Sequence, residues 1–232
     1  MEKLLKTFEA LKQKNLSIDL TRGKPHSDQL DLSNDLMTQV VDPLGENGVD
    51  LRNYGEPIGI IEARKLGADI LDSKIDLTIA GEQSSYLLMT QLLLGRFLFG
   101  LDDGPWKNEK EPAFLCAVPG FDRHFATLEG LGLKMHTVNL CSSGIDLDDL
   151  NKKLSKYPNI KGLICVPRHS NPSGEVFSDE NITNLLKITK EYNPSFINLF
   201  DHAYLIHDFD ETQSQTPIPV LADDLGALDN VA

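Results

Sequence analysis

The fold is decided by residues 160–200, which begin with Ile160-Lys161-Gly162-Leu163-Ile164-Cys165-Val166 and end with Phe196-Ile197-Asn198-Leu199-Phe200. Both runs are short and mostly apolar, which is typical of buried strands. Between them, residues 181–192 carry apolar side chains at helical spacing, and Ser178 is a residue type that caps helices. A strand, a helix and a second strand in this order predict two parallel strands of one sheet.

The same alternation extends toward the amino terminus. We expect strands over Ile75–Ala80, Ala113–Val118 and Lys134–Leu140, and helices over Ile60–Leu71, Ser84–Phe99, Asp122–Leu131 and Asp146–Tyr157. Strands that alternate with helices predict an α/β fold, with a mainly parallel sheet covered by helices on both faces.

The first 50 residues have a different character. Leu4, Leu5, Phe8 and Leu11 fall on one face at helical spacing, so the chain should open with an amphipathic helix that packs on the rest of the chain. Residues 16–51 are rich in Asp, Ser, Asn, Gly and Pro, with a short helical pattern near residues 36–41, and predict an irregular arm.

Composition argues against some partners and locations. The 22 Lys and Arg residues against 35 Asp and Glu give a net charge of -13, which repels nucleic acid and anionic lipid, so we expect neither as a partner. The apolar stretches are far too short to span a membrane. The three cysteines lie far apart and suggest no disulfide framework, which fits the reducing cytoplasm. Cys116 and Cys165 are expected to be buried.

Three polar groups follow predicted strands, at the edge where ligands bind in open α/β sheets. Gly81-Glu82-Gln83-Ser84-Ser85 could hold a phosphate at a helix amino terminus, although helix capping alone explains it. Asn171-Pro172-Ser173-Gly174 is first of all a turn. Asp201-His202-Ala203-Tyr204 places a partly desolvated carboxylate at a strand end, where it needs a partner or caps a following helix.

Other polar residues suggest ordinary structural roles. Asp122-Arg123-His124 reads as a helix start with local ion pairing. The histidines His169, His202 and His207 are too irregular in spacing for a metal site, so we expect no metal.

Taken together, five motifs resemble those of the fold type I pyridoxal-phosphate enzymes, in particular the class I aminotransferases. The resemblance covers nearly the whole chain and is strongest to an atypical bacterial subgroup of aspartate aminotransferases, related to the aminotransferase domain of MocR-type regulators. The motifs are Thr21-Arg22-Gly23-Lys24-Pro25, Asn53-Tyr54-Gly55-Glu56-Pro57-Ile58-Gly59, Pro119-Gly120-Phe121-Asp122-Arg123-His124-Phe125, Asn171-Pro172-Ser173-Gly174 and Asp201-His202-Ala203-Tyr204.

The resemblance implies how the ring of pyridoxal 5'-phosphate would be held. Asp201 would pair with the protonated pyridine nitrogen, and Asn171 and Tyr204 would hydrogen-bond the phenolic oxygen. Phe121 would stack on the face of the ring, where many relatives carry a different aromatic residue.

The resemblance also implies the remaining contacts. Ser84 and Ser85, with Gln83 as a further candidate, would hold the phosphate. Tyr54 would reach the phosphate of the neighbouring subunit, which implies a homodimer. Gly23 would lie near the substrate carboxylate. Residues 1–50 would then be an amino-terminal helix and arm belonging to a small domain, and residues 51–232 an incomplete large domain.

The implied activity is transfer of an amino group from an amino acid to a 2-oxo acid, with aspartate and glutamate as the expected substrates. A lyase, or an aminotransferase for other amino acids, would share the same motifs. The family's catalytic lysine follows the Asp-x-x-Tyr strand, but the last lysine here is Lys190, and residues 202–232 contain neither Lys nor Arg. We therefore expect a truncated aminotransferase that has no catalytic residue, exposes an unpaired strand edge and is poorly soluble. The alternative is a non-catalytic binding or heterodimer module.

Overall fold

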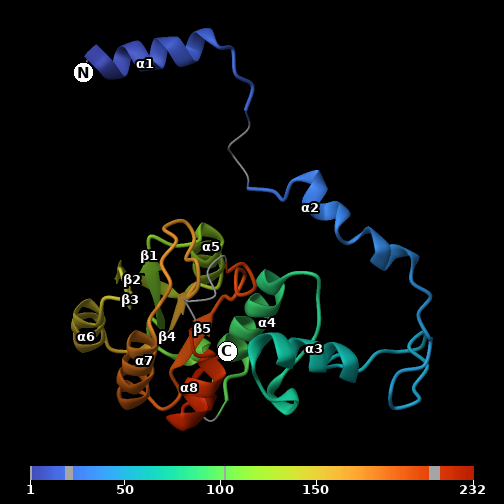
Figure 1. The fold of residues 1–232 in the computed structure, drawn as a ribbon. Helices are drawn as coiled ribbons and strands as arrows, with labels where there is room; N and C mark the ends of the chain where they lie inside the picture. Colours follow the sequence, from blue (N-terminus) through green and yellow to red (C-terminus); the bar gives the residue numbers. More distant parts are fainter. Residues whose placement is uncertain (1, 19–22, 102, 209–214) are drawn as a thin grey trace. The chain divides into compact units, whose positions relative to one another are not determined.

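The computed structural model of the chain describes residues 2–18, 23–101, 103–208 and 215–232. It divides into two compact units, Met1–Leu44 and Gly45–Ala232 (Figure 1). The first unit contains helices α1 (Glu2–Gln13) and α2 (Ser27–Asp31) and the 3-10 helix η1 (Asn34–Thr38), none with a buried residue. The amphipathic helix is confirmed. Its packing on the rest of the chain and the domain boundary at residue 50 stay predictions.

The second unit is built on a five-stranded sheet. Its strands are β1 (Ala113–Val118), β2 (Lys134–Cys141), β3 (Gly144–Ile145), β4 (Ile160–Cys165) and β5 (Ile197–Phe200), in the order β3-β2-β1-β4-β5. All neighbours are parallel except β2 and β3. Beyond β5, Val231 forms an isolated parallel bridge with Asn198. The predicted α/β fold with a mainly parallel sheet is therefore confirmed.

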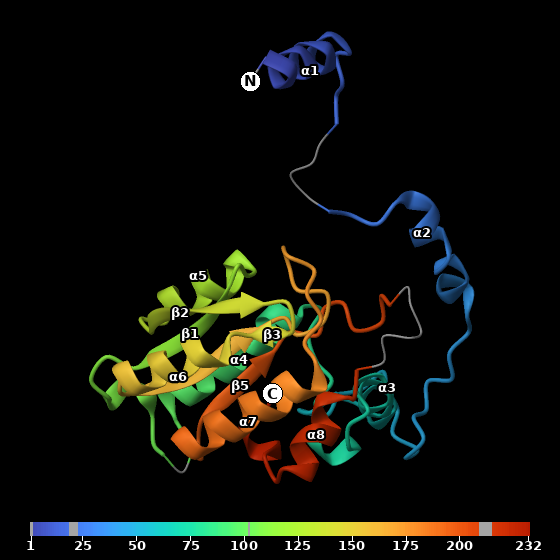
Figure 2. The same ribbon diagram turned by 60° about the vertical axis from the view of Figure 1, so that its left-hand side comes forward.

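Helices cover both faces of this sheet, as expected (Figure 2). Along β1, Leu115 and Ala117 point into one core with helices α6 (Leu147–Lys156), α7 (Asp179–Tyr192) and α8 (Ile218–Asp224). Phe114 and Cys116 point into a second core with α4 (Ser85–Leu98) and α5 (Asp122–Gly130). The remaining elements of this unit are α3 (Ile61–Leu71), η2 (Ile75–Leu77), η3 (Trp106–Asn108) and η4 (Leu228–Asn230). Among the described residues, no helix has the length and apolar character that crossing a membrane requires.

Local signals in the sequence explain where helices begin. The Ser178 side chain accepts a hydrogen bond from the Asn181 backbone N–H at the start of α7, as predicted. Asp146 does the same for α6, accepting from the backbone N–H groups of Asp148 and Asp149. Cys116 and Cys165 are buried, also as predicted, and burial raises the pKa of both thiols, that of Cys116 to about 12.

The predicted strand over Ile75–Ala80 is wrong. The segment begins with the 3-10 helix η2 and pairs with no strand of the sheet. The guanidinium of Arg64 donates hydrogen bonds to the carbonyl oxygens of Ile75, at 2.7 Å, and Thr78, at 2.9 Å. The Arg64 side chain of α3 therefore binds carbonyl groups that a strand would use to pair with its neighbour. The apolar pattern of the segment itself cannot reveal this contact.

Candidate functional site

The candidate site lies where the carboxyl ends of β1, β4 and β5 meet. These three strands are parallel neighbours, so the loops that follow them emerge at one edge of the sheet. Asp201 comes directly after β5, and its backbone N–H donates to the carbonyl oxygen of Cys165 at the end of β4. The Asp201 residue is 7% exposed. A carboxylate so nearly removed from water requires strong hydrogen-bonding partners.

The main partner of Asp201 is His124, whose Nε2 atom lies 2.9 Å from Asp201 Oδ2. His124 is itself only 3% exposed. The other carboxylate oxygen accepts a 3.1 Å hydrogen bond from the backbone N–H of Ala203. Since a carboxylate can only accept, His124 must present an N–H to it.

Two interpretations of the sequence are corrected by this pair. His124 does belong to a helix start, but its side chain contacts Asp201 from across the sheet edge instead of a neighbour within the helix. Asp201 caps no helix, because described residues 201–208 form only turns. The first turn of α5 points His124 toward the end of β5, a relation between residues 77 apart in the chain.

Phe121, the residue before α5, joins the same group. Its ring packs edge-on against the His124 ring, with centroids 5.2 Å apart. The guanidinium carbon of Arg123 lies 5.9 Å from the centroid of the Phe121 ring. The loop after β1 thus brings one half-buried aromatic ring next to the Asp201–His124 pair.

Asn171 and Tyr204 are also brought together. The side-chain amide of Asn171 donates a 3.1 Å hydrogen bond to the Tyr204 hydroxyl. Asn171 belongs to the loop after β4 and Tyr204 to the loop after β5, and both are half-buried. Four of the residues singled out in the sequence therefore meet within three neighbouring loops of one sheet edge: Phe121, Asn171, Asp201 and Tyr204.

Ser84 and Ser85 stand at the amino terminus of α4. Ser84 occupies the N-cap position, as the capping interpretation predicts, but its side chain makes no capping hydrogen bond. The start of α4 is tied to α5, because the Thr127 hydroxyl donates a 2.7 Å hydrogen bond to the Tyr86 hydroxyl. The helix terminus therefore offers backbone N–H groups and the Ser84 hydroxyl to an anion.

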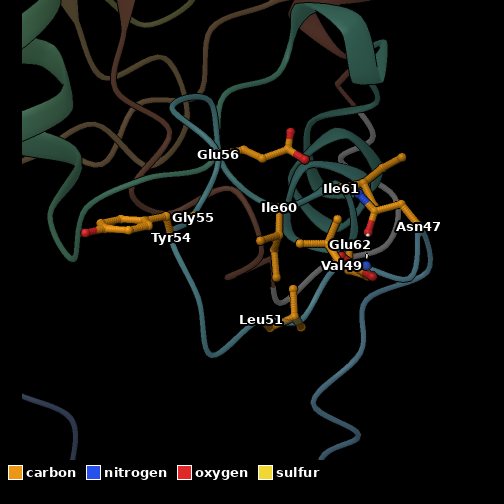
Figure 3. Close-up of a pocket in the computed structure, with 9 residues that line it drawn as sticks. All are labelled: Asn47, Val49, Leu51, Tyr54, Gly55, Glu56, Ile60, Ile61 and Glu62. Carbon is orange, nitrogen blue, oxygen red and sulfur yellow. Dashed lines mark hydrogen bonds between the residues drawn. The ribbon is translucent and has the colours of Figure 1, made fainter.

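The other two predicted site residues, Tyr54 and Gly23, belong to earlier segments of the chain. Tyr54 is 97% exposed, and its ring points away from Leu51 and Ile60 (Figure 3). The cavity beside it measures about 20 Å³, room for roughly one water molecule. Gly23 belongs to the first unit, and its place near a substrate stays a prediction.

A charged cluster next to the site was missed in the sequence. Asp208 is held by Arg168, whose Nε donates to Oδ1 at 2.9 Å and whose Nη2 donates to Oδ2. His169 Nε2 lies 2.7 Å from the same Oδ1. The hydrogen bond from Arg168, and then that from His169, lowers the pKa of Asp208. Within the described ranges, no three His, Cys, Asp or Glu side chains are grouped to hold a metal ion.

The imidazole of His202, next to Asp201 in the chain, has a lowered pKa. Burial lowers the pKa of its imidazole to about 4, and the positive charge of Arg168 acts in the same direction, while Asp201 opposes both. At neutral pH this ring is uncharged.

Fold and site together define a class of protein. A mainly parallel sheet with Asp201 at the end of one strand, Asn171 and Tyr204 in contact and an open helix terminus is the arrangement expected of fold type I aminotransferases. The profile of the aspartate amino-transferase family matches residues 1–231. The chain belongs to this family.

Individual relatives agree. The chain is 37% identical over 210 residues to an aspartate aminotransferase of Corynebacterium glutamicum, a match that covers 89% of this chain and 48% of the relative. A solved aspartate transaminase from the same species superposes with a TM-score of 0.88 at 33% identity, over 99% of this chain and 55% of that one. An archaeal alanine:glyoxylate aminotransferase, at 18% identity and a TM-score of 0.65, shares the fold. The chain spans about half the length of the curated relatives it matches.

Proposed function

We propose that this chain forms the cofactor-binding part of a pyridoxal-phosphate-dependent aminotransferase, which moves an amino group from an amino acid to a 2-oxo acid. The observation that carries the proposal is the buried carboxylate of Asp201 at the end of β5, 2.9 Å from His124. Membership of the aspartate amino-transferase family supports it.

The residues at the sheet edge fit the cofactor. Among the described residues, Asp201 has one imidazole N–H and one backbone N–H as hydrogen-bond partners. A carboxylate offers about four lone-pair positions, so Asp201 keeps capacity for another donor. The protonated nitrogen of a pyridine ring would supply a charge-assisted hydrogen bond there.

Each loop would then have one task at the ring. Pyridoxal 5'-phosphate, when bound, supplies an electron sink for the pair left after an amino acid loses its α-proton. Asp201 would keep the ring nitrogen protonated, because a negative charge compensates the positive one. His124 would fix the direction of that carboxylate. The Asn171 amide and the Tyr204 hydroxyl would hydrogen-bond the phenolic oxygen, and Phe121 would cover one face of the ring.

The phosphate and the substrate complete the proposed site. Ser84, Ser85 and the terminus of α4 would hold the phosphate, with Gln83 as a further donor. Tyr54, which is almost fully exposed, would reach the phosphate of a second subunit in a homodimer. Gly23 would lie near the substrate carboxylate. Aspartate and glutamate with their 2-oxo acids are the proposed substrates, supported by the name of the Corynebacterium glutamicum relative. The free cysteines fit a cytoplasmic location.

The lysine nearest to this sheet edge in the sequence has another role. Lys190 donates to the carbonyl oxygens of Leu225 and Gly226, and residues 202–232 contain no lysine. We propose that the residues named above hold the cofactor through non-covalent contacts.

An absorbance titration with pyridoxal 5'-phosphate, before and after borohydride, tests the proposal. The wild-type chain should bind and shift the cofactor spectrum, and borohydride should attach no cofactor to the protein. Asp201→Asn should weaken binding at least about tenfold, because an amide does not compensate the ring charge. Asp224→Asn, an exposed carboxylate on α8, is the matched control. A wild-type chain that leaves the spectrum unchanged would overturn the proposed cofactor site, and a reduced covalent adduct would overturn the non-covalent mode.

A further inference from the structure

Residues 201–208, which follow β5, are anchored at both ends. The first residue, Asp201, donates a backbone hydrogen bond to Cys165 and pairs with His124. At the other end of residues 201–208, Asp208 is bound by Arg168 and His169 of the neighbouring loop. Tyr204 lies between these anchors and meets Asn171 at 3.1 Å.

We propose that Asp208 is a positioning residue, which holds the Tyr204 hydroxyl against the Asn171 amide through its contacts with Arg168 and His169. This inference rests on the proposed function, in which that hydroxyl and amide meet the phenolic oxygen of the cofactor. It concerns residues to which the resemblance assigned no role.

The geometry of the ion pair supports a positioning role. Arg168 binds both oxygens of Asp208 through Nε and Nη2, and such a two-point contact fixes orientation as well as distance. The Arg168 side chain is only 8% exposed and that of Asp208 33%, so solvent screens this pair less than a surface pair. His169 adds a second contact from the same loop, at Asp208 Oδ1.

Both partners of this ion pair lie close in sequence to a residue of the site. Arg168 and His169 precede Asn171 by three and two residues, and Asp208 follows Tyr204 by four. The turns between are closed by backbone hydrogen bonds, from the Leu205 N–H to the His202 carbonyl and from the His207 N–H to the Tyr204 carbonyl. A change at Asp208 therefore reaches Tyr204 through one ordered turn.

Amide hydrogen exchange of the purified full chain tests the anchor without cofactor. In Asp208→Asn, the amides of Leu205 and His207 should exchange at least about tenfold faster than in the wild type, whereas those of Leu185 and Leu186 in α7 keep their rates. Asp223→Asn, which breaks the exposed 2.7 Å pair with Lys74, is the matched control and should change none of them. Unchanged rates at Leu205 and His207, or an equal increase in α7, would overturn the inference.

A separate measurement follows the position of the Tyr204 hydroxyl relative to the Asn171 amide. In NMR spectra, the Asn171 side-chain NH2 resonances should shift in Asp208→Asn, and Asp208→Glu, which keeps the charge, should restore them at least in part. A purely structural loss of stability would not move this pair of resonances at temperatures where the chain stays folded. Unmoved resonances would overturn the positioning role. If the wild-type chain fails to bind pyridoxal 5'-phosphate, the proposed function fails, while exchange and NMR still decide on Asp208.

Discussion

At the scale of single residues, the sheet edge concentrates polar groups that have lost most of their water. His202 shows the cost of such a place. Its Nδ1 atom is buried and has no hydrogen-bond partner within the described part of the chain. Burying an imidazolium without an adjacent acceptor is unfavourable, and the pKa of His202 is accordingly lowered to about 4.

This pKa predicts a loss of stability in acid. Between about pH 6.5 and 4, the unfolded chain binds a proton at residue 202 and the folded chain does not, so the free energy of unfolding falls as the pH falls. The loss is at most about 3.5 kcal/mol, which is about 1.4 kcal/mol for each unit of the shift from 6.5 to about 4. Urea unfolding at pH 7 and pH 4.5 should show a smaller difference for His202→Asn than for the wild type.

His207→Asn is the control, because it removes an imidazole from the same loop at an exposed position. Equal pH dependence in wild type and His202→Asn would show that other groups cause the acid loss.

At the scale of elements, a buried side-chain amide connects a helix and a strand that share no backbone hydrogen bonds. Asn181 of α7 accepts a 2.9 Å hydrogen bond from the Ile145 N–H of β3 and donates a 2.8 Å bond to the Ile145 carbonyl oxygen. Asn181 is 5% exposed and Ile145 fully buried. One side chain thus binds both polar backbone groups of Ile145, in a strand that is only two residues long.

Replacing this amide should destabilise the second unit. Asn181→Ala leaves the buried Ile145 N–H without this partner and its carbonyl oxygen with only the weak 3.8 Å contact from Cys141 Sγ, which costs about 2–4 kcal/mol in the free energy of unfolding. Asn151→Ala on α6 is the matched control, because its amide binds the Leu147 carbonyl in an exposed position and should cost less than about 1 kcal/mol. Urea denaturation measures both. Equal losses in the two variants would show that burial of the Asn181 bonds has no special weight.

Elements also show what the sequence can predict. Strands β1, β4 and β5 and helix α7 were predicted to within about a residue or two, because their apolar patterns and the Ser178 cap are local signals. The two residues of β3 and the 3-10 helix η2 were not, since their partners Asn181 and Arg64 lie elsewhere in the chain.

In the candidate site too, some features could be predicted from the sequence and others could not. The motifs at Asn171, Asp201 and Tyr204 could be read from the sequence, because each lies in a short polar stretch after an apolar strand pattern and matches a motif of the family that the chain resembles. The contacts that hold them could not. His124 meets Asp201 across 77 residues and Arg168 meets Asp208 across 40, and a single sequence does not record which distant charges pair.

At the scale of the whole molecule, charge is unevenly compensated. The sequence carries a net charge of -13, and about half of the ion pairs of the described residues are exposed at both partners, such as Lys6–Glu2 and Lys134–Glu111. Exposed pairs contribute about 0–1 kcal/mol each. Repulsion among the excess carboxylates acts on the compact state as a whole and is not confined to one contact. We therefore expect repulsion to outweigh attraction.

This balance predicts that salt stabilises the chain. Raising NaCl from 10 to 300 mM shortens the Debye length from about 30 Å to about 6 Å, so long-range repulsion is screened more than contacts at 3 Å. The melting temperature should rise by a few degrees, of order 3 °C. Glu129→Lys changes the net charge by two at an exposed position of α5 whose side chain forms no ion pair with the described residues, and should reduce the rise. Thermal melts followed by circular dichroism measure both. A melting temperature that falls with salt in the wild type would show that attractive pairs dominate, and the Asp208–Arg168 pair would then be the first to examine.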